Sequence, residues 1–278
     1  MRLEEESVPV RDVVPAEYAD VVVVITEFGG PSVLLLLLAV VFWCRHRRRT
    51  ALVVSYAVAG LGFILALETV FGLPRPPESV RPTPIDVDGY GFPSGHAFAA
   101  TVVYGGLVSA YDRLRDPLAV AGVTIVIVAI SLSRVVLGVH YLGDVIAGVA
   151  LGVVFVAAMN RLTRGSPLVG FGIAVVAAIP AVYLSPMTTS AILALGGAIG
   201  GLLTAGSIDR LPDLQSRLEA LVLVVVGCGV VFGLRALEPI ITFDPLLVAL
   251  YAVLVAWVIF APAVIGTVRR GLLESSTR

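Results

Sequence analysis

The sequence predicts an all-α polytopic membrane helix bundle. Hydrophobic residues make up 58% of the 278 residues and charged residues only 14%, whereas a soluble domain has roughly 25% charged residues. Long apolar runs occupy residues 118–130, 221–231 and 246–264. Because a membrane span needs about 20 mostly apolar residues, these runs and their neighbours are typical of a protein that crosses the membrane several times.

Hydropathy and helix-breaking residues divide the chain into roughly nine transmembrane helices. The first is interrupted by Gly29-Gly30-Pro31, which indicates a short interfacial piece followed by a span. The third is short for a span and is expected to begin at the membrane surface. In chain order the predicted helices are residues 20–44, 50–73, 96–111, 117–138, 142–160, 168–184, 188–205, 218–234 and 246–268.

The arginines give the orientation of these helices, because arginine-rich loops stay in the cytoplasm. Arginines follow the first, third, fifth, seventh and ninth helices, and this alternation is unbroken. It predicts an N-terminus outside and a C-terminus in the cytoplasm. The arginines on the predicted cytoplasmic side are Arg45, Arg47, Arg48, Arg49, Arg113, Arg115, Arg161, Arg164, Arg210, Arg217, Arg269 and Arg270.

The net charge and the cysteines argue against two features, a nucleic-acid partner and a disulfide framework. The formal net charge is −1 and no long basic tract is present, which argues against a nucleic-acid partner. The two cysteines, Cys44 and Cys228, do not form the pattern of a disulfide framework. The partners we expect are the membrane and a membrane-embedded substrate.

Three arginines depart from the orientation pattern by lying on the predicted outer side close to histidines. Arg75, Arg81 and Arg134 are near His96 and His140 in the sequence. The outer loop of residues 73–95 is also the longest connection in the first half and is rich in Pro, Gly and Asp, and long loops of this kind are often functional. These positions are therefore candidates for a site.

The sequence Pro93-Ser94-Gly95-His96 precedes an apolar run and has the pattern of a helix start with Ser94 as N-cap. The free N–H groups at such an end bind anions, and Gly95 allows a phosphate to approach the backbone. His96 would stand beside that anion. Taken alone, an ordinary helix cap with an interfacial histidine is the simpler interpretation.

A second cluster contains Arg134, His140 and Asp144. The histidine and the aspartate are four residues apart, so on a helix they share one face. The carboxylate could accept from one imidazole nitrogen and leave the other free to attack, and Arg134 offers a fork of donors that matches phosphate oxygens. A polar turn held by a His–Asp pair is the alternative, and a zinc site of His96, His140 and Asp144 is another.

Together the clusters have the parts that phosphoryl transfer needs. These parts are positive donors for the phosphate oxygens, a nucleophile in line with the leaving group, and an acid for the leaving oxygen. The sequence has no cluster of carboxylates to hold Mg²⁺, and no residue pattern in it points to a cofactor.

These residues carry a resemblance to the type 2 phosphatidic acid phosphatase superfamily, which includes the vanadium haloperoxidases. Its motifs are Lys, six residues, Arg-Pro; then Pro-Ser-Gly-His; then Ser-Arg, five residues, His, three residues, Asp. The second is complete at residues 93–96 and the third at residues 133–144. The resemblance covers residues 20–160.

The resemblance implies a role for each motif residue. His140 would form a phosphohistidine, oriented by Asp144, and His96 would protonate the leaving group and then activate water. Arg75, Ser94, Gly95 and Arg134 would hold the phosphate. No metal is implied, and vanadate should inhibit.

The first motif departs from the pattern, because Glu68 stands where the family has Lys. A carboxylate at that position would not stabilise a phosphate and could instead pair with Arg75. Arg81 could supply the missing charge. We therefore treat Glu68 and Arg81 as auxiliary positions.

We expect an N-terminal tail (1–19), a catalytic helix bundle (20–165) and additional transmembrane helices (166–278). Glycines such as Gly196-Gly197 and Gly200-Gly201 favour close helix packing in the added region, either within one chain or between the copies of a homo-oligomer. A groove for a lipid tail is the alternative role of this region. The expected function is hydrolysis of a lipid phosphate, either a polyprenyl diphosphate or a phosphatidate-like lipid, at the extracytoplasmic face of the cell membrane. The alternative is a catalytically weakened relative that serves as a transporter or scaffold.

Overall fold

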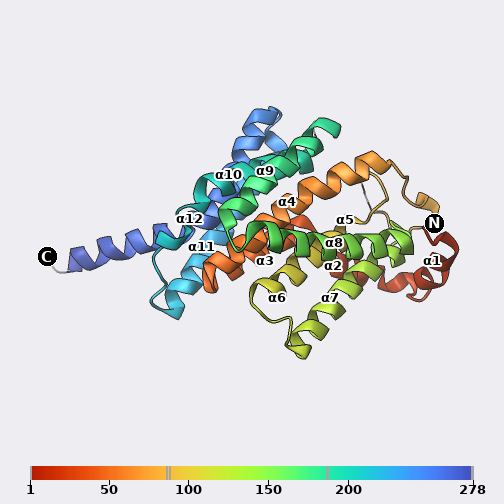
Figure 1. The fold of residues 1–278 in the computed structure, drawn as a ribbon, viewed down its shortest axis with the longest axis horizontal. Coiled ribbons are helices and arrows are strands. Elements are labelled where there is room, and N and C mark those ends of the chain that lie inside the picture. The colour runs from red at the N-terminus through yellow and green to blue at the C-terminus, as the bar shows by residue number, and fades with distance from the viewer. Residues whose placement is uncertain (1, 86, 88, 186–187, 277–278) are drawn as a thin grey trace.

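A computed structural model of the protein describes residues 2–85, 87, 89–185 and 188–276 (Figure 1). All regular secondary structure in these ranges is helical. The α-helices are α1 Glu4–Arg11, α2 Ala19–Glu27, α3 Pro31–Cys44, α4 Arg47–Phe71, α5 Gly95–Ala100, α6 Gly106–Ala110, α7 Pro117–Val136, α8 Leu142–Thr163, α9 Pro167–Leu184, α10 Thr189–Ala205, α11 Arg217–Ala236 and α12 Asp244–Ser276. A π-helical turn, η3 Thr101–Gly105, joins α5 to α6 without a break.

Capping residues set the starts of several helices. Asp116 accepts hydrogen bonds from the backbone N–H groups of Leu118 and Ala119, and Pro117 begins α7. Ser166, Thr188 and Ser216 cap α9, α10 and α11 in the same way. Such caps satisfy N–H groups that the first turn of a helix leaves without partners, and a proline in that turn has no N–H to satisfy.

The first predicted helix is broken where the sequence indicated. Helix α2 ends at Glu27, α3 begins at Pro31, and the two axes differ by 49°. The intervening Gly29 and Gly30 carry no side chain, and Gly29 lies against Ile130 of α7 and the backbone oxygen of His96. The break therefore brings the start of α3 close to the start of α5.

The predicted number of nine spans is not confirmed. Within the described residues, six helices are long and apolar enough to cross a membrane, or seven if the bent pair α2–α3 is one span. The two remaining predicted spans are shorter: residues 95–110 form one helical run with the π turn inside it, and α10 has 17 residues. Several helices of this length establish a multi-pass membrane protein.

Helix α4 lies between two groups of helices and contacts both (Figure 1). On one side are α5, α6 and α8, and on the other are α9 and α10. Small residues permit the close approaches: a Cβ at Gly62 would lie 2.8 Å from the Ala177 carbonyl oxygen, and Gly200 of α10 lies directly on the backbone of Ala252 in α12. Close packing through glycine is the common solution where lipid replaces water.

The helix ends gather into two opposite sets. At one end Arg49 pairs with Asp112 at 2.9 Å, Arg48 pairs with Asp209 at 3.2 Å, and the His46 and Tyr111 rings lie 6.0 Å apart. These contacts join the α3–α4, α6–α7 and α10–α11 connections. At the other end Thr69 bonds to Ser185 at 2.5 Å and Arg235 to Ser32 at 3.2 Å.

The predicted tail is folded onto the bundle. Helix α1 lies against α7 and α8, where Val10 packs beside Val135 and Val145. The Ser7 hydroxyl accepts a hydrogen bond of 2.8 Å from the Leu142 N–H at the start of α8. The N-terminal segment thus covers the end of the bundle that carries His140.

Candidate active site

A cavity of about 360 Å³ lies among α3, α4, α5, α10 and α12, and we call it the active-site cavity. Its polar residues gather toward the His140 end of the bundle, and most of the remaining lining is apolar. The predicted site residues that line it are Glu68, Arg75, Gly95, His96, Arg134 and His140. These six residues come from three separate stretches of the sequence, which therefore meet at one place.

The turn after α7 places His140. Gly138 has a φ of 65°, a left-handed conformation that glycine adopts without strain, and a Cβ there would lie 2.8 Å from the Val80 carbonyl oxygen. The N–H groups of Val139 and His140 then fold back onto the Arg134 carbonyl oxygen, at 3.2 and 3.3 Å. The turn therefore brings both His140 and Arg134 of the third motif to the active-site cavity.

Both nitrogens of the His140 ring have partners. Nε2 lies 2.9 Å from Arg75 Nη1, and Nδ1 lies 2.8 Å from the Gly91 carbonyl oxygen. A guanidinium can only donate, so Nε2 accepts and Nδ1 carries the hydrogen. The pKa of His140 is lowered from 6.5 to about 4, chiefly by burial and also by the charges of Arg75 and Arg134, while Asp144 and the Gly91 carbonyl oxygen act in the opposite direction. The imidazole is therefore neutral at pH 7, with its lone pair at Nε2.

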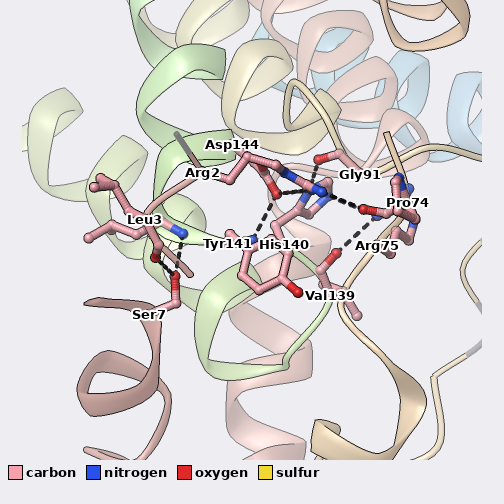
Figure 2. A network of polar contacts seen from close by, with 11 residues as sticks. Arg2, Leu3, Ser7, Pro74, Arg75, Gly91, Val139, His140, Tyr141 and Asp144 are labelled. Atoms are coloured by element: carbon pink, nitrogen blue, oxygen red, sulfur yellow. Dashed lines mark hydrogen bonds and ion pairs between the residues drawn. The ribbon is translucent and has the colours of Figure 1, made fainter. Parts of the chain in front are cut away.

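Asp144 makes its closest contacts away from His140 (Figure 2). Its Oδ2 lies 3.7 Å from His140 Nδ1, which is beyond hydrogen-bond length. Arg2 instead donates from Nε to Oδ1 and from Nη2 to Oδ2, both at 2.8 Å. The Tyr141 N–H also donates to Oδ2 at 2.8 Å. The expected proximity of His140 and Asp144 is present, but the direct hydrogen bond is not.

Ser94 occupies the N-cap position of α5, as the sequence predicts, but its side chain makes no capping hydrogen bond. Its Oγ is buried and has no partner among the described residues. The Ser94 N–H donates to the Asp144 carbonyl oxygen at 3.0 Å, which ties the start of α5 to the first turn of α8. Ser94 itself is not among the described residues that line the active-site cavity.

Arg134 and Glu68 complete the polar end of the cavity. Arg134 is buried, donates from Nη1 to the Thr26 hydroxyl at 3.0 Å, and has an Nε without a partner in the described part of the chain. Glu68 interacts electrostatically with Arg75 and Arg134. A Cβ at Gly95 would lie only 3.0 Å from Glu68 Oε1, so the missing side chain at Gly95 makes room for this glutamate.

Comparison with known families then identifies the fold that carries these residues. Residues 32–166 match the family described as the PAP2 superfamily. This part of the chain belongs to the PAP2 superfamily. The matched region extends from α3 to the connection before α9 and contains all three motif regions. Membership suggests phosphatase activity and association with a membrane.

Comparisons of the chain with curated proteins and with solved structures gave no match. The PAP2 assignment therefore indicates the class of chemistry and leaves the individual substrate to the residues of this chain.

One predicted residue lies apart from the PAP2 site. Arg81 donates to Glu78 at 3.4 Å and to the Ile85 carbonyl oxygen at 3.2 Å, and it is not among the described residues that line the active-site cavity. The structure does not place it where it would replace the lysine that Glu68 displaces. Within the described ranges, no group of three or more His, Cys, Asp or Glu side chains is placed to hold a metal ion.

Sequence reasoning missed Arg2 and Thr26 as partners of the PAP2 site. Arg2 reaches Asp144 across 142 positions of sequence, and Thr26 reaches Arg134 across 108. The only signal for Arg2 was a basic residue in an otherwise acidic segment on the predicted outer side. Spacing within a motif reveals neighbours on one element, whereas these contacts depend on how the elements pack.

Proposed function

We propose that this PAP2 protein is a metal-independent membrane phosphatase that hydrolyses a lipid phosphomonoester or diphosphate through a phosphohistidine at His140. One observation carries the proposal. The buried ring of His140 presents an unprotonated Nε2 at the polar end of the active-site cavity, beside Arg75 and Arg134. A neutral imidazole with a fixed tautomer among cations is suited to attack an anionic phosphoryl group.

In the first step the Nε2 lone pair of His140 forms a bond to phosphorus while the bond to the leaving oxygen breaks. Arg75 bonds to that lone pair in the free protein, so it must turn toward the phosphate oxygens as substrate binds. Arg134 and Ser94 supply donors that have no partner among the described residues. His96, in its protonated form, gives its proton to the leaving alkoxide or phosphate.

In the second step His96 takes a proton from water, and the hydroxide attacks phosphorus. The P–N bond breaks, inorganic phosphate leaves, and the electron pair returns to Nε2. The ring is cationic only while it carries the phosphoryl group, when the nearby Asp144 carboxylate stabilises it. The Nδ1 hydrogen stays on the ring throughout.

The apolar part of the active-site cavity supports a lipid as substrate. On α4 the lining residues run from Val54 to Glu68 along one face of the helix, a length of about 21 Å at 1.5 Å per residue. Gly197 of α10 and Val255 of α12 belong to the opposite wall. The region 166–278 therefore adds a wall to the cavity, and a hydrocarbon chain can lie there while its phosphate meets His140.

The proposed face is extracytoplasmic. The His140 end of the bundle is opposite the end where Arg48 and Arg49 make their ion pairs, and arginine-rich ends stay in the cytoplasm. This orientation favours a polyprenyl diphosphate carrier over a phosphatidate-like lipid, because a spent carrier presents its diphosphate on that face. Both remain substrates for the test.

The test is phosphate release by the purified protein in detergent with EDTA. The substrates are polyprenyl diphosphate, phosphatidate and a glycerophosphate lipid. We expect release from one class, lost in His140→Ala and retained in His46→Ala, whose histidine lies at the opposite end beside Tyr111. Release abolished by EDTA would favour a metallohydrolase. No release from any lipid would favour a transporter or scaffold in which Glu68 marks the loss of catalysis.

A further inference from the structure

The N-terminal segment reaches the proposed nucleophile through one side chain. Arg2 binds both oxygens of Asp144, and the exposed fractions of the two side chains are 12% and 0%. Its Nη1 also donates to the Pro74 carbonyl oxygen at 2.6 Å, and its guanidinium lies 4.7 Å from the centre of the Tyr141 ring. The backbone is held as well, because the Gly143 N–H donates to the Arg2 carbonyl oxygen at 2.9 Å.

Small residues make room for this contact. A Cβ at Gly91 would lie 2.6 Å from Arg2 Nη2, and a Cβ at Gly143 would lie 2.7 Å from the Arg2 carbonyl oxygen. Gly91 is also the residue whose carbonyl oxygen receives the Nδ1 hydrogen of His140. Two groups lie near that hydrogen, the Gly91 carbonyl oxygen and the Asp144 carboxylate. The Arg2 side chain bonds to the carboxylate and lies beside Gly91 (Figure 2).

We propose that Arg2 is a positioning residue of this site, which holds the Asp144 carboxylate by both oxygens and offsets its charge, so that the Nδ1 hydrogen of His140 rests on Gly91. The inference rests on the proposed function, because it concerns the proposed nucleophile. A paired fork of two N–H···O bonds fixes a carboxylate more firmly than one contact. Asp144 then remains 3.7 Å from Nδ1, close enough to stabilise a cationic ring without binding the neutral one.

Arg2 thus limits how strongly Asp144 favours the protonated imidazole. The charged or titratable groups that act on His140 are Arg75 from the α4–α5 connection, His96 from α5, Arg134 from α7 and Asp144 from α8. Of these only Asp144 favours the cation, and Arg2 is its cationic partner. Without Arg2 the carboxylate would be a buried anion beside the ring, and an uncompensated opposite charge raises the pKa of an imidazole.

The experiment is a titration of the histidine rings by ¹⁵N NMR in wild type, Arg2→Gln, Arg2→Lys and Arg11→Gln. The chain has three histidines, so the ring signals are assigned with His46→Gln and His96→Gln. We expect Arg2→Gln to raise the pKa of His140 by about one unit. Arg2→Lys should raise it less, because an ammonium keeps the charge but cannot occupy both oxygens. Arg11→Gln, which loses only an ion pair to Asp12, should leave the pKa unchanged.

The acid limb of kcat/KM should move to higher pH by the same amount in Arg2→Gln. An unchanged His140 titration in folded Arg2→Gln would overturn the proposal. Where that variant does not fold, an unchanged titration in Arg2→Lys would overturn it instead. The NMR result stands even for a protein that releases no phosphate, which separates this inference from the proposed function.

Discussion

His96 and His140 line the same cavity but have different surroundings. Both ring nitrogens of His140 are occupied by Arg75 and Gly91, which fixes the tautomer and directs one lone pair into the site. The His96 ring has no hydrogen bond to any described residue and is only partly buried. A nucleophile needs a fixed direction, whereas a group that gives and takes a proton needs access to the leaving oxygen and to water.

Replacing His96 with Ala should slow the release of phosphate from an alkyl lipid phosphate by about 10²–10⁴-fold, the usual contribution of a general acid–base group. With p-nitrophenyl phosphate the leaving group needs no proton, so the variant should show a rapid burst of one nitrophenol per active protein before the slow step. Stopped-flow absorbance measures the burst. Its absence from the variant, with equal losses on both substrates, would contradict the assignment of His96 as the acid.

In its ionised form Glu68 weakens the positive field of the phosphate site, because it interacts with both Arg75 and Arg134. Glu68→Gln removes that negative charge and should tighten inhibition by vanadate about 10-fold, which corresponds to roughly 1.4 kcal/mol. Inhibition curves for phosphate release provide the measurement. The matched control is Glu78→Gln, which loses only an exposed ion pair to Arg81. Weaker inhibition in Glu68→Gln would show that the glutamate instead holds the arginines in place.

The structure brings most of the motif residues to one cavity, but the sequence did not predict several of their partners. Spacing alone brought His140 close to Asp144, and turn chemistry placed Ser94 at a helix start. The hydrogen bond expected between His140 and Asp144 is absent, because Arg2 takes the carboxylate. Such competition depends on a residue 142 positions away, and no local pattern contains it.

At the scale of elements, α4 and α10 determine how far the active-site cavity extends. One face of α4 supplies a row of lining residues, and α10 closes the opposite side at Gly197. The helix limits were predictable because Pro, Gly and capping residues mark them. The number of spans was not, because the π turn in residues 95–110 and the 17 residues of α10 leave elements of intermediate length.

Gly197→Leu should shorten the apolar part of the cavity. A Cβ added at this position would lie 3.3 Å from Val255 and 3.6 Å from Val58. The rest of a leucine side chain must therefore occupy the space that we assign to the lipid. We expect KM for a long-chain substrate to rise about 10-fold, with little change for a short-chain phosphate. Gly229→Leu is the control, since a Cβ at Gly229 meets nothing within 4 Å. Equal effects on both chain lengths would contradict this placement of the lipid.

At the scale of the whole molecule, the two ends of the bundle differ in charge and in chemistry. Arginine-rich connections with exposed ion pairs gather at one end, and the His140 site lies at the other under the N-terminal segment (Figure 1). The sequence predicts an orientation through its pattern of arginines. It does not predict the folding of the segment 2–18 over the site, because the composition of this segment resembles that of an exposed acidic tail.

The orientation predicts which loops a reagent outside the cell can reach. In a Cys44→Ser, Cys228→Ser background, a cysteine at the exposed position Ser79 should react with a membrane-impermeant maleimide on intact cells. A cysteine at Leu114, which is 64% exposed at the opposite end, should react only after the cells are opened. Gel-shift labelling measures both sites. The reverse pattern would place the site in the cytoplasm and exclude an extracytoplasmic substrate.

The central claim is that the phosphoryl group passes through His140, and trapping the phosphoenzyme tests it most directly. Protein mixed with ³²P-labelled lipid phosphate and quenched in alkali should carry label that survives alkali and is lost in acid, as a phosphohistidine requires. Peptide mapping should place it on His140, and none should be found in His140→Ala. Phosphate release without a labelled protein, or label on any other residue, would contradict the account.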